Sequence, residues 1–228
     1  MPDAEHILAG LADIAGEWRL LAGAWHVWFG AWLLLLALGK RTPRRVAGML
    51  LAAPLVSVAV LAWAAGNPFN GTAFTVAIVL LFSIAAGMRS GPFELAPLPW
   101  ILAGSVMVLF GWFYPHFLTG ASPAAYALAG PLGLIPCPTL SMLTGLSLIL
   151  GGLGSFAWSF VLGTLGIFYG AFGASWLGVR IDWILAAGAA ALLVQAMLRV
   201  TGAEKRARGS GEPGTSSTGP RRKGGGVA

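Results

Sequence analysis

The sequence predicts an all-α polytopic integral membrane protein, a bundle of seven transmembrane helices with its N-terminus outside and its C-terminus in the cytoplasm. Composition is the first reason: 57% of the 228 residues are hydrophobic, 10% are charged, and the mean hydropathy is +0.80. Soluble domains carry about 25% charged residues. The second reason is that the apolar residues form runs near the roughly 20 residues that cross a bilayer. The third is that basic residues gather in alternate gaps between these runs.

Seven apolar runs mark the expected spans, at residues 20–39, 46–65, 72–88, 98–113, 138–151, 156–177 and 183–198. The fifth run is short for a complete crossing. We therefore expect it to begin earlier, near Gly133, or to start below the membrane surface after an irregular stretch. An alternative is a re-entrant fifth segment that enters from the outside and returns. Residues 20–200 together form the predicted membrane domain.

The orientation follows from the basic residues, because cytoplasmic loops carry an excess of Lys and Arg. The first gap, 40–45, holds four of them, the third holds Arg89, and the segment from Arg199 onward holds seven. With seven spans and the N-terminus outside, 12 of the 14 basic residues are cytoplasmic, and Arg19 and Arg180 lie outside. A re-entrant fifth segment would instead place the basic tail outside.

The two ends of the chain differ from the membrane domain. Residues 1–19 form a short acidic segment without the basic region and cleavage site of a signal peptide. Residues 201–228 are rich in Gly, Ser, Pro, Thr and basic side chains, so we expect a disordered basic cytoplasmic tail. This topology suits a multi-pass protein of a bacterial inner (plasma) membrane, with the lipid bilayer as its main partner. The net charge of +6 is then a topology signal, and we expect no nucleic-acid binding.

Several chemistries are excluded or disfavoured. The single cysteine, Cys137, excludes an internal disulfide and a Cys-x-x-Cys motif. No Asp, Glu, Lys or Arg lies in the middle of a predicted span, which argues against a proton pump of the carboxylate type. The phosphate-binding, zinc-protease and serine-hydrolase motifs are absent as well. The sequence identifies no catalytic residue and no organic cofactor site, and it favours a non-enzymatic protein.

Two histidines and the cysteine fall in the outer half of the predicted bundle. His26 lies in the first span, His116 follows the fourth, and Cys137 begins the fifth between two prolines. With Pro138 as the first helical residue, Cys137 would be the N-cap, where the helix dipole favours a thiolate. If the three side chains converge, they would bind a soft metal ion, copper or zinc. Each also has an ordinary interpretation, as an interfacial, loop or buried side chain.

Small polar residues continue from Cys137 along the fifth span. Cys137, Ser141 and Thr144 fall along one helix face as a polar stripe. We take Thr139, Ser141 and Thr144 as the lining of a candidate substrate pocket. The uncharged segment 118–131 would form a lid over this pocket. Serine and threonine in spans also bond to their own preceding carbonyl groups, which is the structural alternative.

Small residues also form a stripe along the sixth span, through Ser155, Ser159, Gly163, Gly166, Gly170 and Gly173. Residues 186–191 of the seventh span are likewise all Ala or Gly. Such faces let helices approach closely in lipid. They predict either packing within the bundle or a surface for a homo-oligomer or another membrane partner.

Three short motifs carry a family resemblance: Tyr114-Pro115-His116, the segment 122–126, and Pro136-Cys137-Pro138-Thr139. In these motifs the chain resembles an uncharacterised family of bacterial polytopic membrane proteins, a domain of unknown function, over roughly residues 20–200. The resemblance implies a membrane-embedded fold and brings no established activity.

Three functional hypotheses follow. The first is a membrane protein that binds or passes a small solute or metal ion through an outward-facing pocket, with Cys137, His116 and His26 as ligands. The second is a membrane-embedded enzyme with Cys137 as nucleophile and His116 as base. The third is an accessory subunit that a partner contacts through the Gly and Ala faces.

Overall fold

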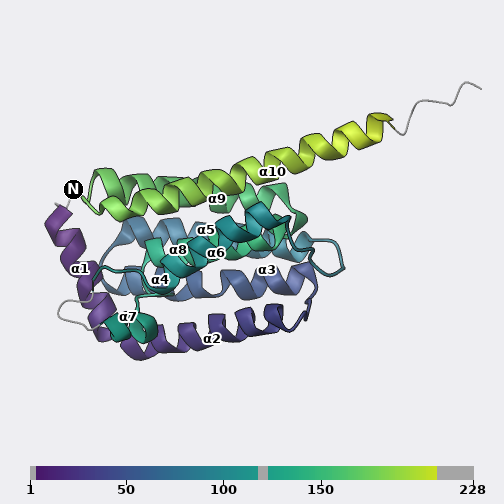
Figure 1. Ribbon diagram of the computed structural model, residues 1–228. Helices are drawn as coiled ribbons and strands as arrows, with labels where there is room; N and C mark the ends of the chain where they lie inside the picture. Colours follow the sequence, from purple (N-terminus) through teal and green to yellow (C-terminus); the bar gives the residue numbers. More distant parts are fainter. Residues whose placement is uncertain (1–3, 118–122, 210–228) are drawn as a thin grey trace, which may run out of the picture.

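The computed structural model describes residues 4–117 and 123–209, and these residues form helices and no strand. The all-α prediction is confirmed. The α-helices, labelled in Figure 1, are α1 (Ala4–Glu17), α2 (Arg19–Ala37), α3 (Arg44–Ala52), α4 (Pro54–Ala64), α5 (Pro68–Gly87), α6 (Leu98–Trp112), α7 (Pro123–Ala129), α8 (Pro136–Ile149), α9 (Phe156–Ser175) and α10 (Trp183–Gly209). Two short 3₁₀ turns, η1 (Gly151–Gly154) and η2 (Arg180–Asp182), precede α9 and α10.

Five helical segments of the described chain are long and apolar enough to cross a membrane. They are α2, the joined α3 and α4, α5, α9, and α10 together with η2. Helices α6 and α8 are apolar but shorter, with 15 and 14 residues. Each of the seven predicted segments therefore coincides with an apolar helix or helix pair, and the fifth begins at Pro136, slightly earlier than its apolar run.

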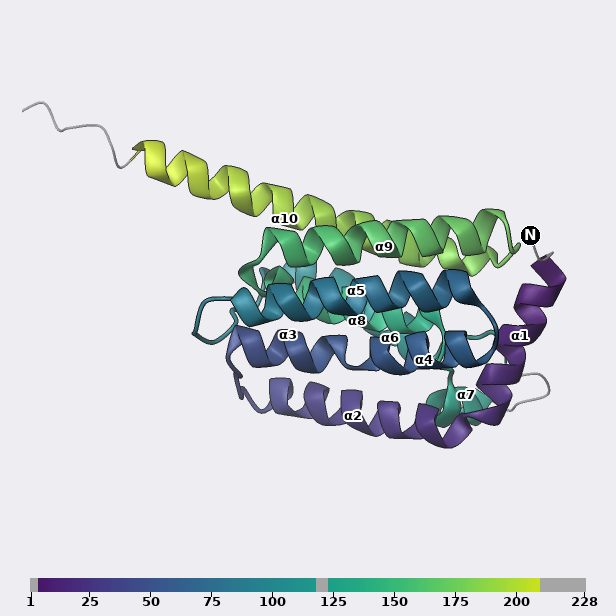
Figure 2. The same ribbon diagram turned by 180° about the vertical axis from the view of Figure 1, so that it is seen from behind.

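These helices run alternately in opposite directions, so their loops gather at two ends of the bundle (Figures 1 and 2). One end holds loops 38–43, 88–97 and 150–155, with Lys40, Arg44 and Arg89, and we call it the arginine end. The opposite end holds residues 65–67, 113–117, 130–135 and 176–182. We call it the tyrosine end, because Tyr114 lies there.

Helix α8 is the centre of the bundle. Every residue from Pro138 to Leu148 is buried, and both views show the helix enclosed by its neighbours (Figures 1 and 2). Helix α6 packs closely against it, because Gly104 and Gly145 bring the two backbones together. The helix carries no charged residue, as expected of a helix that is buried on all sides.

The stripe of small residues on α9 faces α10 inside the chain. A Cβ atom on Gly163, Gly166 or Gly170 would lie within 2.7 Å of an atom of α10. Ala186 and Ala189 of α10 are buried in the same contact. The stripe is therefore used for packing within the bundle. It does not support the hypothesis of a homo-oligomer or of an accessory subunit that a partner contacts through this face.

A proline divides the second span into α3 and α4. Pro54 has no N–H group to bond to the carbonyl four residues earlier, so the helix is interrupted at Ala53 and resumes at once. Ser57, one turn later, donates to the carbonyl oxygens of Pro54 and Gly133 and accepts a hydrogen bond from the indole N–H of Trp25. The interruption thus becomes a junction between the second span, α2 and the segment before α8.

The structure departs from the sequence expectations at three segments. Residues 4–17 of the acidic N-terminal segment form α1, which lies across the tyrosine end (Figure 1). The expected lid contains α7, which contacts α2, while 118–122 lie outside the described residues. Helix α10 continues past the expected boundary at residue 200 to Gly209, and the rest of the predicted tail, 210–228, also lies outside the described residues.

One buried indole joins α8 to α9, and its loss should be measurable. Trp158 is fully buried, and its Nε1–H donates to Ser147 Oγ at 3.0 Å. We expect Trp158→Phe to lower the free energy of unfolding by about 2 kcal/mol, since it removes a buried hydrogen bond and leaves a small void. Trp63→Phe is the control, because Trp63 is half exposed and donates to Thr75 at 3.3 Å. Thermal unfolding in detergent should show the larger loss for Trp158→Phe, and equal losses would contradict this role.

Candidate functional site

The structure does not gather the three predicted metal ligands. Within residues 4–117 and 123–209, no group of three His, Cys, Asp or Glu side chains is placed to hold a metal ion. His26, His116 and Cys137 all lie toward the tyrosine end, but each has different neighbours. The copper or zinc site predicted from these three residues is therefore not formed as a unit.

His26 links α2 to the end of α6. It is buried, with Nδ1 2.8 Å from the Ala22 carbonyl oxygen and Nε2 3.3 Å from the Trp112 carbonyl oxygen. Its ring also meets the indole of Trp112 edge to face, with centroids 4.9 Å apart. Both ring nitrogens thus lie beside backbone carbonyl oxygens, and a neutral ring can donate a hydrogen bond to only one of them. The ordinary interpretation of His26, a hydrogen-bonded side chain, fits these contacts.

His116 packs among aromatic rings just beyond α6. Its ring lies 4.3 Å from that of Phe117 and 6.5 Å from that of Tyr114, centroid to centroid, and both contacts are edge to face. Partial burial lowers the pKa of His116 below its usual range, so the imidazole is neutral at pH 7. Among the described residues it makes no hydrogen bond to Cys137, so the predicted nucleophile and base are not paired.

Cys137 instead interacts with Tyr114 and Asp182, and these three residues form what we call the Tyr114 cluster. The Tyr114 hydroxyl donates to Asp182 Oδ1 at 2.6 Å. Tyr114 and Asp182 are buried, at 0% and 1% exposure, and Cys137 is partly buried. Burial above all, and then Cys137 and Asp182, raise the pKa of Tyr114, so the phenol stays protonated and able to donate.

Three chain segments bring the cluster together. Tyr114 follows α6, Cys137 lies in the first turn of α8, and Asp182 ends η2 just before α10. Gly173 of α9 makes room for the carboxylate, because a Cβ at that position would collide with Asp182 Oδ2. The cluster thus depends on the close approach of α9 and α10, which the small-residue stripe provides.

The start of α8 differs from the prediction in register. Helix α8 begins at Pro136, and Ile135 is its N-cap, so Cys137 lies inside the first turn and is not the cap. Both prolines are tolerated there, because backbone N–H groups in a first helical turn have no partner within the helix. The double proline thus leaves the thiol close to the helix N-terminus, though one position further in than expected.

The predicted substrate-pocket residues are all fully buried. Thr139 donates to the Ile135 carbonyl oxygen and accepts a hydrogen bond from Gly133 N–H, and Ser141 donates to the Met107 carbonyl oxygen. The hydroxyl of Thr144 is buried without a hydrogen-bond partner among the described residues. The structural alternative therefore describes Thr139, which bonds to a preceding carbonyl group of its own chain segment. Ser141 instead bonds across to the backbone of α6.

Two cavities in the described structure lie away from these residues. One, of about 270 Å³, includes Arg44 and Arg89 at the arginine end. The other, of about 220 Å³, is bordered mainly by apolar side chains of α2, with Lys40 and Thr42 at one side. Neither is lined by Cys137, Thr139, Ser141 or Thr144.

A second polar pair lies near the cluster. The Tyr169 hydroxyl of α9 donates to Asn70 Oδ1 of α5 at 2.9 Å, and both side chains are buried. Tyr169 also interacts electrostatically with Cys137. The tyrosine end therefore holds a group of buried polar side chains that extends from α5 to α10.

Sequence reasoning missed Asp182, although the sequence contains a signal. Asp182 is the only acidic residue between Glu94 and Glu204, and it directly precedes an apolar helix. The rule that ionisable residues in the middle of spans mark functional sites does not detect a carboxylate that is buried at a helix end.

No family model, curated protein or solved structure matches the chain. The family resemblance carried by the Tyr-Pro-His and Pro-Cys-Pro-Thr motifs therefore stays a prediction.

Proposed function

We propose that this chain is an integral protein of a bacterial inner membrane that binds or passes a small solute or metal ion at the Tyr114 cluster. In this proposal the chain crosses the membrane seven times. The tyrosine end lies outside and the arginine end lies in the cytoplasm. The carrying observation is the group of a buried phenol, a buried carboxylate and a partly buried thiol, drawn from three separate segments at one end of an apolar bundle.

Large apolar side chains on the outside of the bundle support the membrane location. Val27, Leu34 and Val106 are 74%, 60% and 59% exposed, and many others on the same helices are similar. A soluble monomer rarely exposes an apolar surface of this extent, whereas lipid chains would cover it. The gathering of Lys40, Arg44 and Arg89 at one end supports a cytoplasmic arginine end.

The burial of α8 explains how a helix this short could be one of seven spans. Because α8 is enclosed by other helices, its ends can meet non-helical backbone that is buried in protein and not exposed to lipid. The stretch before α8 is of this kind: Leu132, Leu134 and Ile135 are buried. A short central helix with an irregular, buried approach is compatible with a binding site below the outer surface.

The chemistry of the cluster favours a ligand that accepts or donates hydrogen bonds, or a cation. Asp182 supplies a carboxylate, Cys137 a soft donor atom and Tyr114 a hydroxyl. A metal ion would meet only two of its usual ligand types here, so water or the solute would have to complete its coordination. The enzyme hypothesis lacks support, because Cys137 is not hydrogen-bonded to His116 in the described structure.

The single cysteine allows both parts of the proposal to be tested by alkylation. With the full chain in detergent, we expect Cys137 to react slowly with N-ethylmaleimide, because it is partly buried beside Tyr114 and Asp182. Zinc(II) or copper(I) should slow the reaction further in the wild type but not in Asp182→Asn, with Cys137→Ser as the blank. If neither ion protects the thiol and elemental analysis finds no bound metal, the metal-binding form of the proposal is wrong.

Orientation needs separate reporters. In a Cys137→Ser background, Ala65→Cys places a thiol at the exposed tyrosine end and Ser90→Cys places one at the exposed arginine end. In right-side-out vesicles, an impermeant maleimide should label the cysteine at position 65 and reach the one at position 90 only after the vesicles are opened. The reverse pattern would overturn the proposed orientation.

A further inference from the structure

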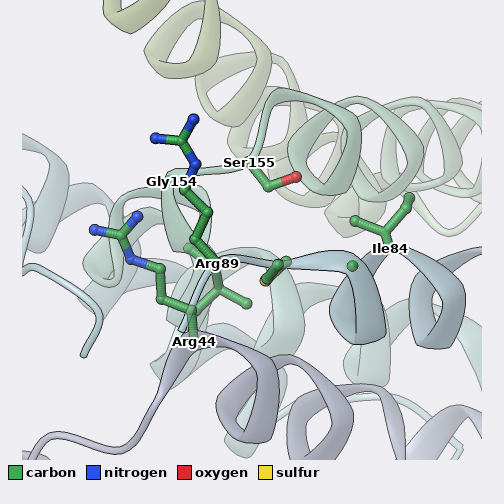
Figure 3. Close-up of a pocket in the computed structure, with 8 residues that line it drawn as sticks. Arg44, Ile84, Arg89, Gly154 and Ser155 are labelled. Atoms are coloured by element: carbon green, nitrogen blue, oxygen red, sulfur yellow. The ribbon is translucent and has the colours of Figure 1, made fainter. Parts of the chain in front are cut away.

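The cavity at the arginine end is lined by charged groups that the Tyr114 cluster does not involve. Its volume is about 270 Å³, and Arg44 and Arg89 form part of its wall together with Gly154 and Ser155. Figure 3 shows both guanidinium groups on the same side of the pocket, while Ile84 lies at the opposite side. The two arginines come from different elements, the start of α3 and the loop after α5.

A third arginine approaches the same loop from α10. The guanidinium group of Arg199 packs against Gly151, and it interacts electrostatically with Arg44 and Glu94. Residues 151–154 all have positive φ, including Leu153 at 53°. Such a backbone is strained for leucine, and Leu153 is held in it by a side chain that is only 1% exposed. Gly151 and Gly154 have no side chains, so Arg199 of α10 and Arg44 of α3 can pack directly against the backbone of this loop.

The local charge is poorly neutralised. Glu94 is the acidic partner, with Oε1 3.7 Å from Arg44 Nη2, and its side chain is 75% exposed. Arg89 has neither a hydrogen bond nor an ion pair to any other described residue. Like charges that lie close together repel each other, so an anion in the cavity would be stabilised.

We propose that this cavity binds a phosphate group, carried either by the headgroup of an anionic phospholipid or by free inorganic phosphate. Arginine presents several N–H donors in a planar fork that matches phosphate oxygens. The cavity lies at the end of helices long enough to cross a bilayer, so in the proposed membrane placement it lies at the level of the headgroups. Basic pockets between helices on the cytoplasmic side of membrane proteins suit such headgroups. The proposal does not involve the Tyr114 cluster, and its lipid form rests on the proposed membrane placement.

The test uses the full chain, delipidated in detergent, with Arg89→Gln as the main variant. Because Arg89 is exposed and unpaired among the described residues, its replacement should leave the fold intact. Native mass spectrometry would count bound phosphatidylglycerol, and tryptophan fluorescence would follow the rise in Tm that the lipid causes. We expect the apparent affinity for phosphatidylglycerol to fall roughly five- to tenfold in Arg89→Gln, the effect of one basic residue at a headgroup.

Arg45→Gln is the matched control, because Arg45 is exposed at the same end but does not line the cavity. It should bind phosphatidylglycerol as the wild type does. A second arm adds sodium phosphate at constant ionic strength. A rise in Tm that Arg89→Gln abolishes would identify free phosphate as a ligand. A rise in Tm with the lipid alone would identify the headgroup. Equal losses in Arg89→Gln and Arg45→Gln, or no response to either ligand, would overturn the proposal.

Discussion

Replacing Tyr114 by phenylalanine is expected to lower the free energy of unfolding by about 3 kcal/mol. The substitution keeps the ring and removes only the hydroxyl that donates to Asp182 Oδ1 at 2.6 Å. Asp182 is 1% exposed, so water does not readily replace the lost donor. Removing one partner of a buried, charge-assisted hydrogen bond is costly because the remaining charge keeps its full desolvation penalty.

Tyr169→Phe is the matched control for this experiment. It also removes a buried tyrosine hydroxyl, but the acceptor there is the neutral amide oxygen of Asn70 at 2.9 Å. Hydrogen bonds to ionised groups are roughly twice as strong as neutral ones, so Tyr169→Phe should cost about half as much. Thermal or SDS-induced unfolding in detergent would measure both losses. Equal losses would mean that Asp182 is not ionised when it accepts from Tyr114.

A double-substitution cycle separates the contact from other effects of the two side chains. With Asp182→Asn in place, the acceptor is already neutral, and the further cost of Tyr114→Phe should fall. If the two losses were simply additive, the hydroxyl and the carboxylate would not be coupled. The polar groups of the Tyr114 cluster would then lie close together without stabilising one another.

The helical content and the rough positions of the apolar helices could be predicted from hydropathy alone. Residues 156–177 and 183–198, for example, coincide closely with α9 and the apolar part of α10. The interruption at Pro54 was also visible in principle, since a proline within an apolar run removes a backbone donor. The helix at residues 4–17 was missed because it is short and does not resemble a membrane span.

The site was harder to predict because hydropathy does not fix how a helix is rotated about its axis. His26 lies in the expected span, but its ring faces the carbonyl oxygens of Ala22 and Trp112. The sequence suggests that the hydroxyls of α8 line a pocket, yet Thr139 and Ser141 bond to backbone carbonyl groups. A histidine or hydroxyl can serve a ligand or the backbone equally well, and only its neighbours decide between the two.

Adding a single methyl group between α6 and α8 is expected to cost as much as losing the Tyr114 hydroxyl. A Cβ atom on Gly104 would lie 2.5 Å from the Gly145 carbonyl oxygen and 2.7 Å from Ile149 Cγ1. The nearest atom belongs to the backbone of the central helix, so it cannot move aside as a flexible side chain could. We therefore expect Gly104→Ala to lower the free energy of unfolding by about 2–3 kcal/mol, the upper part of the usual range for overpacking.

Two further variants test whether the loss in Gly104→Ala comes from the contact between α6 and α8. Gly30→Ala adds the same methyl group within α2, where the new Cβ would meet Trp112 Cη2 at an ordinary 3.5 Å, so its effect should be neutral or slightly stabilising. Gly145→Ala approaches the same contact from the other helix, with its Cβ 2.6 Å from the Gly104 carbonyl oxygen. Once one methyl group has separated the helices, the second finds space already open, so the double variant should lose less than the sum of the single losses. Strict additivity in unfolding experiments would contradict a shared backbone contact, and the close approach of α6 to α8 would then not be what limits the size of these two residues.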